Sequence, residues 1–146
     1  MPVLDQPFHF VRWANPVEVL RVDPSNNSSH LVYQGAEVPG LGQVRGGSQV
    51  IPWNGGYLAL THWVEASQRT APRPDGVYRH RLLFWNRDWQ LQAHSDTFDF
   101  LGAHIEFGAG MCLGPDDAVT MSFGYQDNLA FLATTPNRVV MQMLGI

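Results

Sequence analysis

Residues 48–64 have the sequence SQVIPWNGGYLALTHWV, and they give the clearest indication of the fold. Two apolar runs, Ser48–Pro52 and Tyr57–Val64, stand on either side of the dipeptide Asn54-Gly55. Asparagine and glycine readily adopt the positive φ angles that a tight two-residue turn requires. The stretch therefore predicts a β-hairpin.

Similar runs extend from this hairpin toward both ends of the chain, divided by residues typical of turns. The predicted strands are Val17–Val22, Leu31–Tyr33, Ser48–Pro52, Tyr57–Val64, Val77–Trp85, Ile105–Leu113, Ala118–Phe123 and Leu129–Ala133. Turns are predicted at 23–27, 54–56, 73–76 and 114–117, and longer loops at 37–42 and 66–76. One helix is predicted, over Pro136–Leu144, because proline suits a first helical turn and because Val139, Val140 and Met143 would share a face.

The length of 146 residues predicts one domain, residues 1–146, of the all-β class. Short strands joined by hairpins are typical of sandwiches, barrels and propellers. The spacing favours a propeller of two to three blades, because residues 47–91 contain about four strand candidates, roughly one blade. Periodicity alone leaves a sandwich equally open.

The composition argues against several classes of function. All nine cations are arginine, and the absence of lysine argues against a P-loop, a Schiff-base enzyme, or the binding of nucleic acid and other polyanions. Arginine suits bidentate anion recognition, but the base composition of a genome explains this usage equally well and is favoured.

Targeting signals and metal ligands are not apparent in the sequence. No run approaches the roughly 18 apolar residues of a membrane span, and MPVLDQPFHFVRW lacks a signal-peptide pattern, so we expect a cytoplasmic protein without membrane contact. The single cysteine, Cys112, is expected to be a small buried residue. The histidine spacing predicts no metal site, and no cofactor is expected.

Four motifs occur in order along the chain. They are RGGSQVIPWNGGYLALTHWV (45–64), VYRHRLLFWNRDWQLQAHSDTFDF (77–100), IEFGAGMCL (105–113) and VTMSFGYQDNLAFLAT (119–134). Together they resemble the C-terminal half of glycoside hydrolase family 130, the β-mannoside phosphorylases and their relatives. The resemblance is closer still to related propeller domains found beside or fused to glycosyltransferases, in which a segment similar to WANPVEVLRVD (13–23) precedes the first motif.

This resemblance implies an all-β fold that forms half of a five-bladed β-propeller. It covers nearly the whole chain but only about half of a family member, and the family's catalytic aspartate lies in the other half. Half a ring leaves sheet edges unpaired. We therefore expect a homo-oligomer, most simply a dimer, or a second polypeptide that supplies the remaining blades.

Three candidate ligand contacts belong to the first two motifs. In the Arg-Gly-Gly-Ser run, the glycines let the backbone approach a ligand and Arg45 offers a planar fork to phosphate or sugar hydroxyls. His62 and Tyr78 are similar to family residues beside the bound phosphate. A rim arginine paired with a carboxylate, a histidine bonded to a carbonyl and a packing tyrosine are the structural alternatives.

Glu106 and His80 are the candidates for lining a central channel. Glu106 is the one carboxylate flanked by apolar strand residues, and His80 shares a predicted strand face with Tyr78. An unpartnered buried carboxylate costs several kcal/mol, roughly, so Glu106 either pairs, for instance with Arg45, or faces the channel, which we prefer.

Tyr125 and Asp127 complete the candidate site. The resemblance implies that Asp127 contacts a bound mannosyl unit, since a carboxylate accepts from two sugar hydroxyls and Tyr125 could stack on the ring. A turn explains Asp127 equally well.

Three functions follow as hypotheses. The first is a carbohydrate-binding or carbohydrate-processing accessory protein with a sugar or phosphate ligand. The second is an active β-mannoside glycosidase or phosphorylase formed on assembly, with its catalytic residue unassigned. The third is a self-assembling structural fragment without a ligand.

Overall fold

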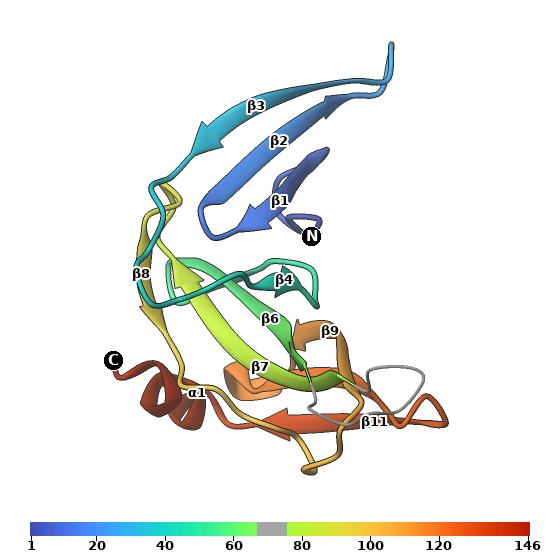
Figure 1. Ribbon diagram of the computed structural model, residues 1–146. Helices are drawn as coiled ribbons and strands as arrows, with labels where there is room; N and C mark the ends of the chain where they lie inside the picture. Colours follow the sequence, from blue (N-terminus) through green and yellow to red (C-terminus); the bar gives the residue numbers. More distant parts are fainter. Residues whose placement is uncertain (67–75) are drawn as a thin grey trace.

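The computed structural model describes residues 1–66 and 76–146 (Figure 1). Of the described residues, 55% are in strands and 8% in helices, so the chain is all-β in class, and these strands form three antiparallel sheets. The first sheet contains β1 (His9–Ala14), β2 (Val17–Asp23) and β3 (Ser28–Gln34). The central sheet contains β4 (Arg45–Gly46), β5 (Ile51–Trp53), β6 (Gly56–Ala66), β7 (Gly76–Trp85) and β8 (Leu91–His94). The last sheet contains β9 (Glu106–Leu113), β10 (Val119–Tyr125) and β11 (Leu129–Thr135), and the elements η1 (Pro115–Asp117) and α1 (Asn137–Leu144) flank its later strands.

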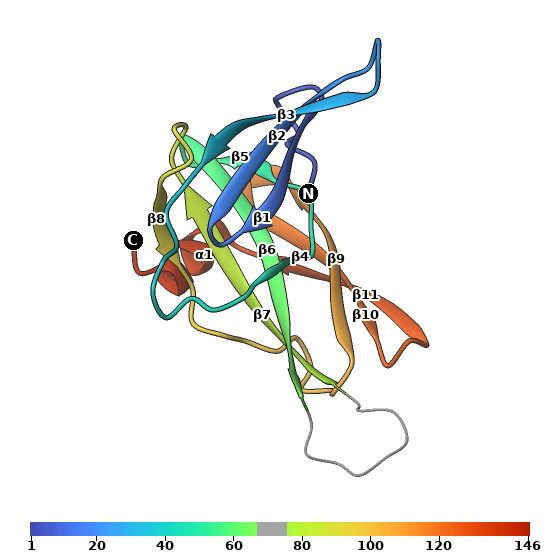
Figure 2. The ribbon, with the colours of Figure 1, turned by 45° about the horizontal axis from the view of Figure 1, so that its top comes forward.

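The three sheets follow one another along an arc (Figure 1). Strands β3, β8 and β11 lie toward the outside of the arc, while β1, β4 and β9 lie toward its inside, where the N-terminus is also found. Figure 2 shows the turn between β2 and β3 at the top of the view and the turn between β10 and β11 at its lower right.

The central sheet is buried on both faces. Successive residues of a strand point to opposite sides of the sheet, so one strand contributes side chains to two different cores. On β6, Tyr57 and Ala59 lie in a core shared with the first sheet, whereas Leu58 and Leu60 lie in a second core shared with the last sheet. Fully burying one large aliphatic side chain contributes about 1.5–3 kcal/mol, so these two cores hold the sheets together. The first core also contains Val11, Val17, Val19, Leu83 and Trp85, and the second contains Leu82, Met111, Val119, Met121 and, from α1, Val140 and Leu144.

Main-chain pairing joins the first and central sheets as well. Val3 forms a parallel bridge with Val50, and Pro2 forms an antiparallel bridge with Phe10 of β1. The bonds on the Val50 side run from the Leu4 N–H to the Val50 carbonyl and from the Val50 N–H to the Pro2 carbonyl. The segment before β1 therefore acts as a strand between the two sheets.

Every predicted strand has a counterpart, and the predicted hairpin is confirmed, with φ of 44° at Asn54 and 74° at Gly55. Several boundaries differ: β3 begins at Ser28 rather than Leu31, and β6, β10 and β11 each end two residues later than predicted. β5 begins at Ile51 rather than Ser48, because the N–H groups of Gly47 and Ser48 both donate to the Leu60 carbonyl and form a bulge. The strands β1, β4 and β8 were not predicted.

The helix prediction is confirmed, but the expectation for Cys112 was wrong. α1 buries Val140 and Leu144, whereas Cys112 is exposed because it lies opposite Thr120 on the face of the last sheet that points away from the second core. Most of the predicted loop at 66–76 and of the turn at 73–76 lies outside the described residues. In the part of the chain that the structure describes, no helix has the length and apolar character needed to cross a membrane.

Candidate functional site

A pocket of about 590 Å³ lies where the end of β1 meets the segment before β4. Its lining includes Arg12, Trp13, Asn15, Glu18, Gln43 and Arg45, and we call it the Arg45 pocket. Trp13 keeps 51% of its surface exposed, which is unusual for so large an apolar side chain. The pocket therefore combines an accessible indole ring with several polar groups.

Hydrogen bonds hold this polar lining in place. Arg12 Nε donates to Glu18 Oε2 at 2.7 Å, which fixes both side chains across the β1–β2 hairpin. The Asn15 amide donates to the Gly42 carbonyl at 3.1 Å, and its Oδ1 accepts from the Val38 N–H at 2.8 Å. These bonds fasten the loop at 38–42 to the turn after β1, so the pocket is formed before any ligand enters.

Three of the predicted site residues are brought together by strand pairing. Arg45 on β4 lies opposite His62 on β6, and His62 lies opposite His80 on β7. The His62 ring is 5.6 Å from the Tyr78 ring and 5.0 Å from the ring of Phe107, measured between centroids. Arg45, His62 and Tyr78 thus form one cluster, and Phe107 belongs to it although its sequence context gave no signal.

The two histidines of this region are buried and favour their neutral forms. Burial lowers the pKa of His62 below the ordinary value of 6.5, and repulsion from the Arg45 guanidinium and from a protonated His80 would lower it further. Burial also lowers the pKa of His80, against the opposing effect of the nearby Glu106 carboxylate. His80 Nε2 accepts a bond from the Gly108 N–H at 3.2 Å, and among the described residues the Nδ1 atoms of both histidines have no partner.

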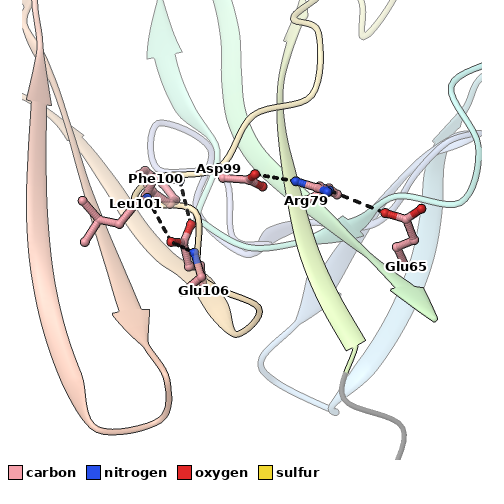
Figure 3. A network of polar contacts seen from close by, with 7 residues as sticks. Glu65, Arg79, Asp99, Phe100, Leu101 and Glu106 are labelled. Atoms are coloured by element: carbon pink, nitrogen blue, oxygen red, sulfur yellow. Dashed lines mark hydrogen bonds and ion pairs between the residues drawn. The ribbon is translucent and has the colours of Figure 1, made fainter. Parts of the chain in front are cut away.

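Glu106 is fully buried and accepts hydrogen bonds from three main-chain N–H groups (Figure 3). Its Oε2 accepts from Phe100 at 2.7 Å, and its Oε1 accepts from Leu101 at 2.9 Å and Ala103 at 2.8 Å. These bonds satisfy the carboxylate without an arginine and fix the turn at 100–103. In the single chain neither Glu106 nor His80 has a surface open to solvent, so neither lines a channel here.

Tyr125 and Asp127 lie at the end of the last sheet where β10 turns into β11. Tyr125 pairs with Glu106 across β9 and β10, and its ring packs edge-on against Phe131 at 5.9 Å. Asp127 is exposed at the tip of the β10–β11 hairpin. Gln126 and Asp127 have φ of 54° and 52°, and the Asn128 N–H donates to the Tyr125 carbonyl at 3.1 Å, which is the geometry of a tight hairpin turn. Asp127 therefore occupies a turn position in this chain.

The sequence reasoning missed most of the residues that line the Arg45 pocket. Trp13 and Arg12 stand in HFVRWA, where a polar and an aromatic residue break the alternation at a bulge between Val11 and Trp13. An exposed tryptophan is the one signal that could have identified this segment, but exposure is not visible in a sequence. Across residues 1–66 and 76–146, no three His, Cys, Asp or Glu side chains gather closely enough to hold a metal ion.

Comparison of the chain with protein-family models, with curated proteins and with solved structures found no match.

Proposed function

We propose that this protein binds carbohydrate through the Arg45 pocket and serves as an accessory to carbohydrate processing. The observation that carries the proposal is the half-exposed Trp13 beside the hydrogen-bonded pair Arg12 and Glu18. An indole ring packs against the C–H face of a pyranose, while fixed planar polar groups bind its hydroxyls. The motif order that resembles family 130 supports the same ligand class.

A binding role is favoured over catalysis because the carboxylates in this region are few and already hydrogen-bonded. Glycoside hydrolysis commonly needs two carboxylates placed about the scissile bond. Among the described residues that line the pocket, Glu18 is the one carboxylate, and its two oxygens accept from Arg12 and from Gln34. Glu106 is likewise occupied by main-chain N–H groups. Hydrolysis or phosphorolysis at the Arg45 pocket would therefore need a carboxylate from outside its described lining.

The proposal is tested by titrating mannosides, mannobiose among them, into the protein by calorimetry. Trp13→Ala is expected to weaken the binding of any sugar that binds by about tenfold or more, since stacking on an aromatic anchor is lost. Phe8→Ala is the matched control, because Phe8 is 53% exposed and lies outside the pocket lining. A Trp13→Ala protein with unchanged affinity would contradict the proposal, as would the absence of heat with every sugar.

We further propose that the three sheets are blades of a partial propeller and that a second copy of the chain completes the ring. The first sheet has one face turned away from the central sheet, which we call its outer face. This face carries the paired row Phe10, Leu20 and Leu31, with Leu31 48% exposed. The outer face of the last sheet carries the pair Ser122 and Leu132, with Leu132 74% exposed. Inside the chain, neighbouring sheets already pack face to face, and a second copy would repeat this packing at both open faces.

A symmetric pair of chains contributes equal numbers of sheets, which constrains the ring. With three sheets in each chain, a closed two-fold ring would have six sheets, so the five-bladed ring implied by the resemblance would need an unequal partner. A self-assembling fragment without a ligand remains the second candidate function, supported by the same exposed faces.

Sedimentation velocity at micromolar concentration is expected to give twice the mass of one chain. Leu132→Arg places a charge on the outer face of the last sheet and is expected to yield single chains, because an unpaired charge in an apolar interface is strongly unfavourable. Leu4→Arg is the control, since Leu4 is 56% exposed and lies on neither face. A single-chain mass for the unaltered protein would contradict self-association.

A further inference from the structure

A second pocket of about 450 Å³ adjoins the Arg45 pocket. It is lined by the Gly40-Leu41-Gly42 segment together with Gln43, Arg45, Trp63, Val64 and Arg81, so that Gln43 and Arg45 belong to both pockets. None of these residues belongs to the His62 and Tyr78 cluster except Arg45. We call it the Arg81 pocket.

Two guanidinium-bearing residues line the Arg81 pocket, and no carboxylate occurs among its described lining residues. Arg12, Arg79 and Arg87 each form a salt bridge with an acidic residue, whereas Arg45 and Arg81 form none with any described residue. Figure 3 shows one of these salt-bridged residues, Arg79 of β7, between Glu65 and Asp99. The positive charges of the Arg81 pocket are therefore not neutralised by the described part of the chain.

The Arg81 side chain is held in position but lacks an acceptor. Its guanidinium carbon lies 5.5 Å from the centroid of the Trp63 ring, a cation–π contact that restrains the planar group. Its Nε is buried and has no hydrogen-bond partner among the described residues. A buried N–H donor without an acceptor costs about as much as a lost hydrogen bond, so such atoms usually have one.

The opposite side of the pocket is a short loop with little side-chain bulk. Leu41 is buried and its N–H donates to the Val38 carbonyl at 3.3 Å, which anchors the loop. Gly40 and Gly42 have φ of 80° and 71°, a conformation that side chains disfavour, and no atom lies within 4 Å of the position a Cβ would take at either one. A ligand can therefore approach the main chain at this loop.

We propose that the Arg81 pocket binds the carboxylate of an acidic sugar, a hexuronic acid, whose neighbouring residues occupy the Arg45 pocket. A carboxylate is planar and singly charged, and it matches the fork of N–H groups that a guanidinium presents. The indole of Trp63 and the side chain of Val64 supply apolar walls suited to the sugar ring that carries it. The inference rests on the proposed carbohydrate binding only for the occupant of the Arg45 pocket, because the anion site stands on its own residues.

Calorimetry at fixed ionic strength with methyl glucuronide, methyl glucoside and glucose 6-phosphate tests the proposal. The glucuronide is expected to bind at least about tenfold more tightly than the neutral glucoside, as charge-assisted bonds to arginine are about twice as strong as neutral ones. Arg81→Gln is expected to weaken glucuronide binding by about tenfold and glucoside binding much less, which removes this preference. Arg81→Lys keeps the charge but loses the fork, so it should restore only part of the preference.

Two further variants serve as a second test of the site and as a control. Arg45→Gln alters an exposed position at the sheet edge and is expected to weaken glucuronide binding even if Arg81→Gln impairs folding. Arg21→Gln removes an exposed arginine that lines neither pocket and is expected to change nothing.

The outcomes separate this inference from the proposed function. Equal affinity for glucuronide and glucoside, or a preference for glucose 6-phosphate, would overturn the carboxylate site and leave carbohydrate binding standing. If Arg81→Gln abolishes glucuronide binding and the unaltered protein binds no neutral sugar, the result would support the anion site and contradict the binding of neutral sugars in the Arg45 pocket. Absence of binding by every compound at millimolar concentration would overturn both.

Discussion

Replacing Glu106 with alanine is expected to lower the free energy of unfolding by about 3–5 kcal/mol. The substitution removes the acceptor for the N–H groups of Phe100, Leu101 and Ala103 at once and leaves a void in a site that has no exposed surface. The turn at 100–103 should lose its conformation, and Phe100, which stacks on Phe123 at 4.0 Å, should lose its position with it. Urea unfolding followed by fluorescence measures the effect.

Two variants identify the cause of the Glu106 effect. Glu106→Gln keeps one acceptor oxygen and the side-chain volume, so it is expected to cost about half as much, since its amide nitrogen would face an N–H group. Glu65→Gln alters an exposed carboxylate whose contact with Arg79 is 3.6 Å long, and it should change stability by less than about 0.5 kcal/mol. A Glu106→Ala protein as stable as the Glu65 variant would show that the three bonds contribute little.

Gly56→Ala is expected to destabilise the protein by about 3 kcal/mol or more. A Cβ at Gly56 would lie 2.1 Å from the carbonyl oxygen of Trp85 and 2.8 Å from the Phe84 ring. The carbonyl belongs to β7, which pairs with β6 along its whole length, so the backbone cannot move aside without breaking the ladder. Thermal unfolding of the variant beside the unaltered protein measures the loss.

The adjacent Gly55 offers a matched control. It has φ of 74°, and no atom lies within 4 Å of the position its Cβ would occupy. Gly55→Ala therefore introduces backbone strain alone, which costs roughly 1–2 kcal/mol. Equal losses for the two variants would mean that contact with Trp85 is relieved by small shifts and that steric clash is not the controlling effect.

The fold class was predictable because local signals agreed with long-range packing. Asn54-Gly55 fixed a turn through its own φ preferences, and the alternation on β6 and β7 matched two separate cores. The strands that escaped prediction have weak local patterns: β4 has two residues, β8 has four, and β1 contains a bulge. Pairing with a neighbouring strand, rather than intrinsic preference, makes these segments extended.

The candidate site was predictable only in part. Arg45, His62 and Tyr78 form one cluster as a result of strand register, which the order of motifs indicated but residue spacing alone could not establish. The partners of Glu106 come from an irregular turn, and the surroundings of Trp13 come from a loop that Asn15 fastens in place. Contacts of this kind form only when the chain is folded, so no local sequence pattern predicts them. The propeller and the family resemblance stay predictions.

The consecutive order of the sheets has a consequence for synthesis on the ribosome. The first sheet uses residues 9–34, the central sheet uses 45–94 and the last uses 106–135, so each sheet consists of one continuous segment. A domain of this kind can fold progressively from its N-terminus as the chain emerges. The face of the central sheet that bears Leu58 and Leu60 stays uncovered until β9, β10 and α1 have been synthesised, because these elements bury it. The nascent chain should therefore be most prone to aggregation after residue 94 has emerged and before α1 is complete.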